Sequence, residues 1–85
     1  MYIHLGGDYV VADRDIIGIF DLENTTVSKN TREFLKICEK RKEVVYVSYE
    51  LPKSFVLTSK ENKNKVYISQ ISPTTLSKRL GINIK

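Results

Sequence analysis

Six short segments of the chain have the composition or the alternating pattern of β-strands, and turn-forming residues separate them. In the first segment, Ile3 and Leu5 would share the buried face of a strand. Gly18, inside the third segment, predicts a β-bulge, whereas residues 6–8 and 59–65 are typical of hairpin loops. The predicted strands are residues 2–5, 9–12, 16–21, 44–49, 54–58 and 66–71. Short strands joined by such loops pair mostly antiparallel, which predicts a small, mostly antiparallel sheet.

Two predicted helices accompany these strands. Ser28 is a suitable N-cap for the first helix, whose apolar face would hold Thr31, Phe34, Leu35 and Cys38. Ser72 would cap the second helix, Pro73 fits its first turn, and Gly81 would end it. The expected order of elements is therefore βββ-α-βββ-α, and the expected fold class is α+β.

The chain has 85 residues, and we expect residues 1–85 to form a single domain. Domains of this size bury a modest core and often gain stability by oligomerising. Cys38 is the only cysteine, which favours a reducing, cytoplasmic setting. No signal-peptide pattern is visible at the amino terminus, and the longest apolar run is about five residues, against roughly 20 for a membrane helix. We therefore expect a cytoplasmic protein without a membrane partner.

Residues that carry enzyme chemistry are scarce in this chain. His4 is the only histidine and lies on a predicted strand, whereas Cys38 lies on the apolar face of a predicted helix. Their placement supports no pairing of a nucleophile with a base, and a structural role is expected for both. No glycine-rich phosphate loop, Cys-x-x-Cys or histidine cluster is present. We expect no enzyme activity, no cofactor, no metal and no small-molecule substrate.

The segment DRDIIG, residues 13–18, begins like a calcium-binding loop. However, Ile17 stands where an oxygen ligand is required, and Asn24 stands where an acid should close the site. The calcium interpretation is therefore rejected. The two aspartates are expected to hold the intervening Arg14 by charge pairing instead.

Charge is distributed unevenly along the chain, whose formal net charge is +4. Residues 1–28 carry one basic and five acidic side chains, a net charge of −4, whereas residues 29–85 carry thirteen basic and five acidic side chains, a net charge of +8. The basic part would meet an anionic partner such as nucleic acid. The alternative is a solvated, lysine-rich surface.

The segment TTLSKRLGI, residues 74–82, could open a helix-turn-helix motif. That motif needs a recognition helix after the glycine turn, but only four residues follow Gly81. Leu76 and Leu80 are spaced so that both can pack on a sheet. We therefore interpret this segment as a terminal helix that packs on the sheet and not as a recognition helix.

Two segments resemble the small bacterial RemA/RemB family of extracellular-matrix (biofilm) regulators, and its RemB branch in particular. They are MYIHLGGDYVVADRDIIGIFD at the amino terminus and VYISQISPTTLSKRLG near the carboxyl terminus, and the likeness extends from Met1 to Gly81. The resemblance implies a non-enzymatic, DNA-binding transcription regulator that forms a ring-shaped homo-oligomer. Repeating a basic surface around such a ring would multiply weak phosphate contacts.

The resemblance also implies where DNA would bind. An arginine after the second strand contacts DNA in the RemA branch, and Arg14 matches it. In that branch, arginines of the loop before the middle strand also contact DNA. The corresponding loop of this chain reads YELPKS at 49–54, where Lys53 alone keeps a positive charge. We predict that Arg14 and Lys53 contact phosphates of double-stranded DNA, followed by Lys78 and Arg79. The alternative role of each is a salt bridge.

Two functional hypotheses follow from these observations. The first is a DNA-binding regulator of extracellular-matrix genes that contacts mainly the DNA backbone, because no base-reading element is evident. The second is an oligomeric protein-interaction module without DNA binding, to which the missing loop arginines point.

Overall fold

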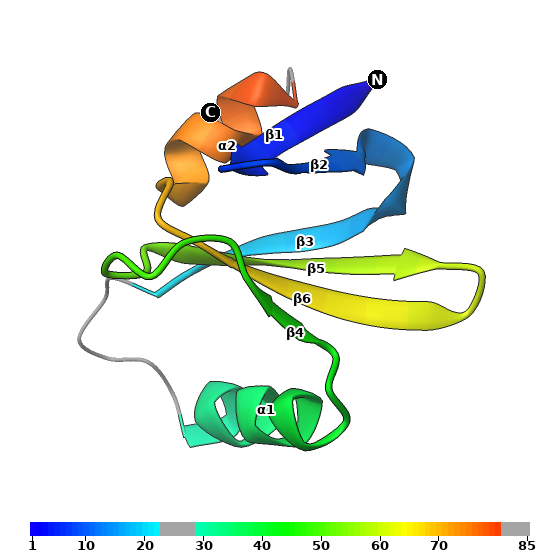
Figure 1. Cartoon of the computed structure of the whole chain (residues 1–85), viewed down its shortest axis with the longest axis vertical. Coiled ribbons are helices and arrows are strands. Elements are labelled where there is room, and N and C mark those ends of the chain that lie inside the picture. Colours follow the sequence, from blue (N-terminus) through cyan, green and yellow to red (C-terminus); the bar gives the residue numbers. More distant parts are fainter. Residues whose placement is uncertain (23–28, 81–85) are drawn as a thin grey trace.

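The computed structural model describes residues 1–22 and 29–80 (Figure 1). The strands are β1 (Tyr2–Gly6), β2 (Tyr9–Ala12), β3 (Ile16–Asp21), β4 (Val44–Tyr46), β5 (Ser54–Lys60) and β6 (Lys63–Ser69). The helices are α1 (Lys29–Lys40), α2 (Pro73–Arg79) and the short 3-10 helix η1 (Asp13–Asp15). The predicted α+β class and the order βββ-α-βββ-α are confirmed, with η1 as an addition.

The strands form two sheets. β1 and β2 pair as an antiparallel hairpin, and the other strands form a sheet in the order β3-β5-β6-β4. β4 runs parallel to β6, whereas the remaining pairs are antiparallel, as predicted for most of the sheet. In Figure 1, α1 lies on one side of the larger sheet, and α2 lies with the β1–β2 hairpin on the other. The larger sheet is therefore the middle of three layers.

Each face of the larger sheet packs against its own hydrophobic core, because successive strand residues point to opposite faces. On the α1 side, Phe55 of β5 packs with Val66 and Ile68 of β6, which share a face as predicted. On the other side, the adjacent Val56 is fully buried in a cluster with Ile3, Leu5, Val11, Val47 and Leu76. Full burial of such a side chain contributes about 1.5–3 kcal/mol, so the two cores hold the three layers together.

Helix α1 uses only part of its predicted apolar face. Cys38 is buried and Leu35 is half-buried, and both contact the core on this side. The ring of Phe34 lies 6.4 Å from that of Phe55 but remains partly exposed. The proposed N-cap, Ser28, lies outside the described residues.

Helix α2 begins as the sequence predicts. The Ser72 hydroxyl accepts a hydrogen bond from the Thr75 amide at 3.3 Å, and Pro73 is the first helical residue. Leu76 is fully buried, and Leu80 packs against the same core. The predicted stop at Gly81 lies outside the described residues.

The hairpin between β5 and β6 differs from the prediction. Residues 59–65 were expected to be a loop, but the pairing continues to Lys60 and Lys63, which leaves only Glu61 and Asn62 as a turn. Both turn residues have positive φ, 51° and 65°, as a tight two-residue hairpin turn requires. β6 accordingly covers 63–69 and not 66–71. The prediction was wrong because polar residues also pair in a ladder when a tight turn sets their register.

Two other details of the sheet test the strand predictions. Gly18 lies at a shift of register between β3 and β5, which confirms the predicted bulge. β4 ends at Tyr46, so the predicted strand 44–49 was too long. The Val47 amide still donates to the Ile68 carbonyl at 3.0 Å, after which the chain leaves the sheet.

Candidate functional site

The structure places Arg14 and Lys53 at opposite ends of one strand pair. Arg14 lies in η1, just before β3 begins, whereas Lys53 immediately precedes β5. β3 and β5 run antiparallel, and the Lys53 carbonyl accepts from the Leu22 amide beyond the far end of β3. The five residue steps of β3 correspond to about 17 Å at roughly 3.4 Å per residue. Arg14 and Lys53 therefore do not form one compact site within a single chain.

The other two predicted contacts lie on α2, across the molecule from the α1 layer. Lys78 and Arg79 are both exposed. Arg79 nevertheless has a structural partner, because its Nη1 donates a hydrogen bond to the His4 carbonyl of β1 at 2.8 Å. This bond links α2 to the β1–β2 hairpin, so the guanidinium of Arg79 has a structural role.

The loop that would carry arginines in the RemA branch presents apolar side chains. Residues 47–53 connect β4 to β5, and Tyr49 is fully exposed while Leu51 is 80% exposed. The Ser48 hydroxyl accepts from the Glu50 amide at 3.1 Å. The Lys53 amide donates to the Ser69 carbonyl at 2.9 Å, which fixes the end of the loop on the sheet.

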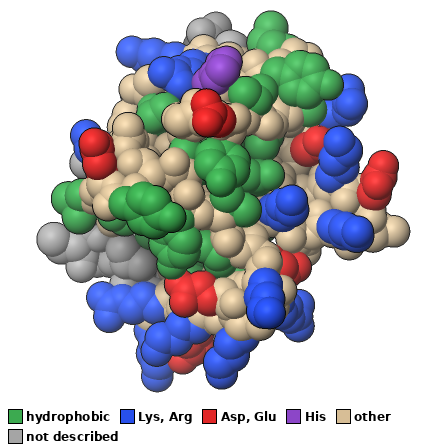
Figure 2. All heavy atoms as spheres, viewed as in Figure 1, with side chains coloured by type: hydrophobic (Ala, Val, Ile, Leu, Met, Phe, Trp, Pro, Cys, Tyr) green, Lys and Arg blue, Asp and Glu red, His purple; other side chains and the backbone are tan. Residues whose placement is uncertain are grey.

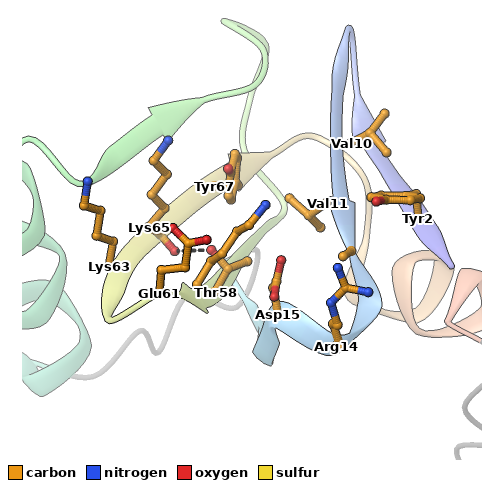
Figure 3. Close-up of a pocket in the computed structure, with 12 residues that line it drawn as sticks. Tyr2, Val10, Val11, Arg14, Asp15, Thr58, Glu61, Lys63, Lys65 and Tyr67 are labelled. Carbon is orange, nitrogen blue, oxygen red and sulfur yellow. Dashed lines mark hydrogen bonds between the residues drawn. The ribbon is translucent and has the colours of Figure 1, made fainter.

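Arg14 lies instead across a cleft from a group of lysines of the β5–β6 hairpin. A cleft of about 310 Å³ separates η1 and the β1–β2 hairpin from the end of β5 and β6 (Figure 3). Its basic lining residues are Arg14, Lys60, Lys63 and Lys65, and its acidic ones are Asp15 and Glu61. Four cations against two carboxylates leave an excess of positive charge in the cleft.

The expected charge pairing of Arg14 is not found. Within the described residues Arg14 makes no ion pair with either flanking aspartate, and Asp13 instead lies 3.6 Å from the terminal ammonium of Met1. The Asp13 amide also donates to the Met1 carbonyl at 2.9 Å. Asp13 is therefore engaged by Met1, the residue before β1, and the exposed Arg14 side chain points toward the cleft (Figure 3).

The cleft is lined by one half-buried aromatic ring, that of Tyr67. The ring of Tyr67, from β6, meets that of Tyr9, from β2, edge to face, with centroids 6.2 Å apart. Burial raises the pKa of Tyr67 above its usual value, and the nearby Tyr9 and Asp15 act in the same direction. Its hydroxyl therefore stays protonated at neutral pH and remains able to donate a hydrogen bond.

Sequence reasoning missed the hairpin lysines. They were assigned to a hairpin loop, although the alternation of lysine around a turn containing Asn62 was available as a signal that the two strands pair as far as the turn. Their proximity to Arg14 could not be inferred, because more than forty residues separate them along the chain. The pairing of β3 with β5, which follows from the tertiary fold, brings the two regions together.

Other chemistry in the described residues is limited. Residues 1–22 and 29–80 contain no group of three or more histidine, cysteine or acidic side chains that could hold a metal ion. Cys38 is buried, and desolvation raises the pKa of its thiol, as does the charge of Glu43. No helix in this part of the chain has the length and apolar character needed to cross a membrane.

Comparison with known proteins identifies the class. The family model for RemA-like proteins, described as "Extracellular matrix regulatory protein A-like", matches residues 2–80. The chain therefore belongs to the RemA-like family of extracellular-matrix regulatory proteins. It is similar to Extracellular matrix regulatory protein B of Bacillus subtilis (strain 168), with 44% identity over 79 residues, covering 93% of this chain and 89% of that protein. The resemblance to the RemB branch is thereby confirmed.

Proposed function

We propose that this protein is a cytoplasmic, DNA-binding transcription regulator of extracellular-matrix genes that acts as a ring-shaped homo-oligomer and contacts mainly the DNA backbone. The matrix-regulating role follows the names of the family and of the Bacillus relative. The observation that carries DNA binding is the environment of Arg14. This arginine matches a contact position of the RemA branch, is exposed, and makes no ion pair within the described residues.

Exposed apolar side chains support assembly. Large hydrophobic residues at least 40% exposed include Ile17, Phe20, Ile37, Tyr46, Tyr49 and Leu51. Figure 2 shows several hydrophobic groups close together on one face of the molecule. Such groups on a small domain mark surfaces that other proteins cover. A second copy of the chain would bury them, and a closed assembly would repeat the basic residues around its surface.

Spacing of the predicted contacts also favours a repeated array. Arg14 and Lys53 lie beyond opposite ends of β3, whose five residue steps span about 17 Å at roughly 3.4 Å per residue, so these two cations do not share one site. Weak contacts of this kind become effective when several protomers engage one duplex.

Titration of duplex DNA against salt tests the proposal. The logarithm of the association constant should fall with the logarithm of salt concentration by about 0.9 per phosphate contacted, and Arg14→Ala should make that slope shallower. Light scattering should give a mass several times that of the 9.8 kDa chain. Absence of binding by the assembled protein at low salt would contradict DNA binding, and a monomer at micromolar concentration would contradict the ring.

The second candidate function, an oligomeric protein-interaction module without DNA binding, is favoured by the loop 47–53. In this loop the side chain of Tyr49 is fully exposed to solvent and that of Leu51 is largely exposed. DNA binding by the wild-type protein separates the two functions. The assembled wild type should bind duplex DNA at low salt if the protein is a DNA-binding regulator, and it should not bind duplex DNA if it is an interaction module. In the second case Tyr49→Ser/Leu51→Ser should weaken binding of the partner protein.

A further inference from the structure

We propose that the β5–β6 hairpin is part of the DNA-binding surface, with Lys60, Lys63 and Lys65 acting together with Arg14 to hold the phosphate backbone. This inference rests on the proposed DNA-binding function and extends it to residues that the family resemblance did not indicate. We name the surface formed by these four residues the hairpin cleft.

Strand register places the three lysines on one face of the sheet. Lys60 is directly opposite Lys63, and Thr58 is directly opposite Lys65. Directly opposed residues of an antiparallel pair point to the same side, as do alternate residues such as Lys63, Lys65 and Tyr67. All three lysines therefore face the side on which η1 and the β1–β2 hairpin lie. In Figure 3, Lys63 and Lys65 project from one side of the cleft, and Arg14 lies on the other.

The hairpin concentrates positive charge without neutralising it. Lys60 and Lys63 form a directly opposed like-charge pair, an arrangement that destabilises a sheet. Neither lysine makes an ion pair within the described residues, and neither does Lys65. Because the hairpin extends beyond the hydrophobic cores, packing does not require lysine at these positions. An anion bound between the lysines would offset their mutual repulsion.

Charge complementarity favours duplex DNA as the occupant. DNA carries one negative charge per roughly 1.7 Å of helix axis, so cations on both walls of the cleft can each meet a phosphate. Lysine contributes flexible point charges and no fixed hydrogen-bonding fork, which suits backbone binding without base recognition. Asp15 and Glu61 weaken the attraction but leave the cleft with an excess of two positive charges.

The hairpin cleft also accounts for the altered loop. Residues 49–54 keep a single cation, Lys53, at one end of the β3–β5 pair, whereas the hairpin cleft lies at the other end. A DNA path along the hairpin end would engage Arg14 and three lysines of each protomer without any arginine from the loop. The main phosphate contacts of this chain are thus moved from the loop to the hairpin.

Matched double substitutions test this assignment. Lys63→Gln/Lys65→Gln removes two charges from the hairpin cleft, and Lys36→Gln/Lys40→Gln removes two exposed charges from α1, on the opposite side of the sheet. If both hairpin lysines contact phosphates, the salt slope should fall by about 1.8, which corresponds to roughly 60-fold weaker binding at ~0.1 M salt. The α1 variant should change affinity less than about three-fold, a loss we attribute to net charge alone. Glu61→Gln should tighten binding.

Three results would overturn the inference. One is an equal loss of affinity in the two double variants, which would mean that net charge alone governs binding. Another is wild-type affinity in the hairpin variant together with a large loss for Lys53→Ala, which would return the contacts to the loop. The third is unchanged affinity for Glu61→Gln. Failure of the wild-type protein to bind any duplex would instead refute the proposed function itself. Circular dichroism and light scattering on each variant confirm that fold and assembly are intact.

Discussion

Replacing Ser69 with alanine should destabilise the protein far more than the loss of one hydroxyl suggests. Ser69 is fully buried at the end of β6, and its Oγ donates to the Leu5 carbonyl at 2.7 Å. The same oxygen accepts from the Ile71 amide at 3.0 Å. It thus connects the larger sheet to the β1–β2 hairpin. Ser69→Ala would leave a carbonyl and an amide without this partner, at about 1–3 kcal/mol for each buried group.

We expect a total cost of about 2–4 kcal/mol, because Ile71 is only half-buried. A domain of this length has a free energy of unfolding of roughly 4–13 kcal/mol, so the loss is a large fraction of it. The measurement is urea denaturation followed by circular dichroism, at a single protein concentration because self-association makes apparent stability depend on concentration. Ser59→Ala is the matched control, since Ser59 is half-buried in β5 and makes no side-chain hydrogen bond within the described residues. A difference between the variants below about 0.5 kcal/mol would refute the reasoning.

Three further predictions concern packing, the turn and one tyrosine. Leu76→Ala should lower the free energy of unfolding by about 2–5 kcal/mol, measured by urea denaturation, because the side chain is fully buried between α2 and the sheet. Asn62→Gly should leave stability unchanged or raise it slightly, because φ is 65° there, whereas Asn64→Gly inside β6 should lower the thermal midpoint. Glu39→Gln should lower the pKa of Tyr46 in an ultraviolet titration, because the hydrogen bond from that phenol to the Glu39 carboxylate at 2.8 Å raises it, with burial and the carboxylate charge acting the same way. Since the folded-state pKa of Tyr46 is raised, this contact stabilises the fold at neutral pH and loses its effect as pH rises through the tyrosine titration.

Local patterns predicted most of the secondary structure correctly. The alternation of Ile3 and Leu5, the bulge at Gly18 and the start of α2 at Ser72 and Pro73 each depend on a few neighbouring residues. Features that depend on distant pairing were missed. The division into two sheets and the parallel pairing of β4 with β6 follow from how segments pack together, which no local pattern contains.

The candidate site was less predictable for the same reason. Resemblance indicated Arg14 and Lys53 separately, but their positions at opposite ends of the β3–β5 pair required the sheet order. The role of Arg79 in holding His4 joins residues 75 positions apart. Residues 59–65 were assigned as a loop from their polar composition alone. The lysines of this segment, which line the same cleft as Arg14, were therefore not predicted to belong to the site.

Successive side chains of β5 pack into different cores, so this strand should tolerate insertions and deletions poorly. Phe55 and Val56 are neighbours in sequence, yet one packs toward α1 and the other toward α2. Deleting a single residue within β5 would exchange the two faces, so that both cores would lose their side chains in one event. The loop 47–53 has no such constraint over its exposed middle residues 49–52. Length variation should therefore accumulate in that loop and be absent from the strand that follows it.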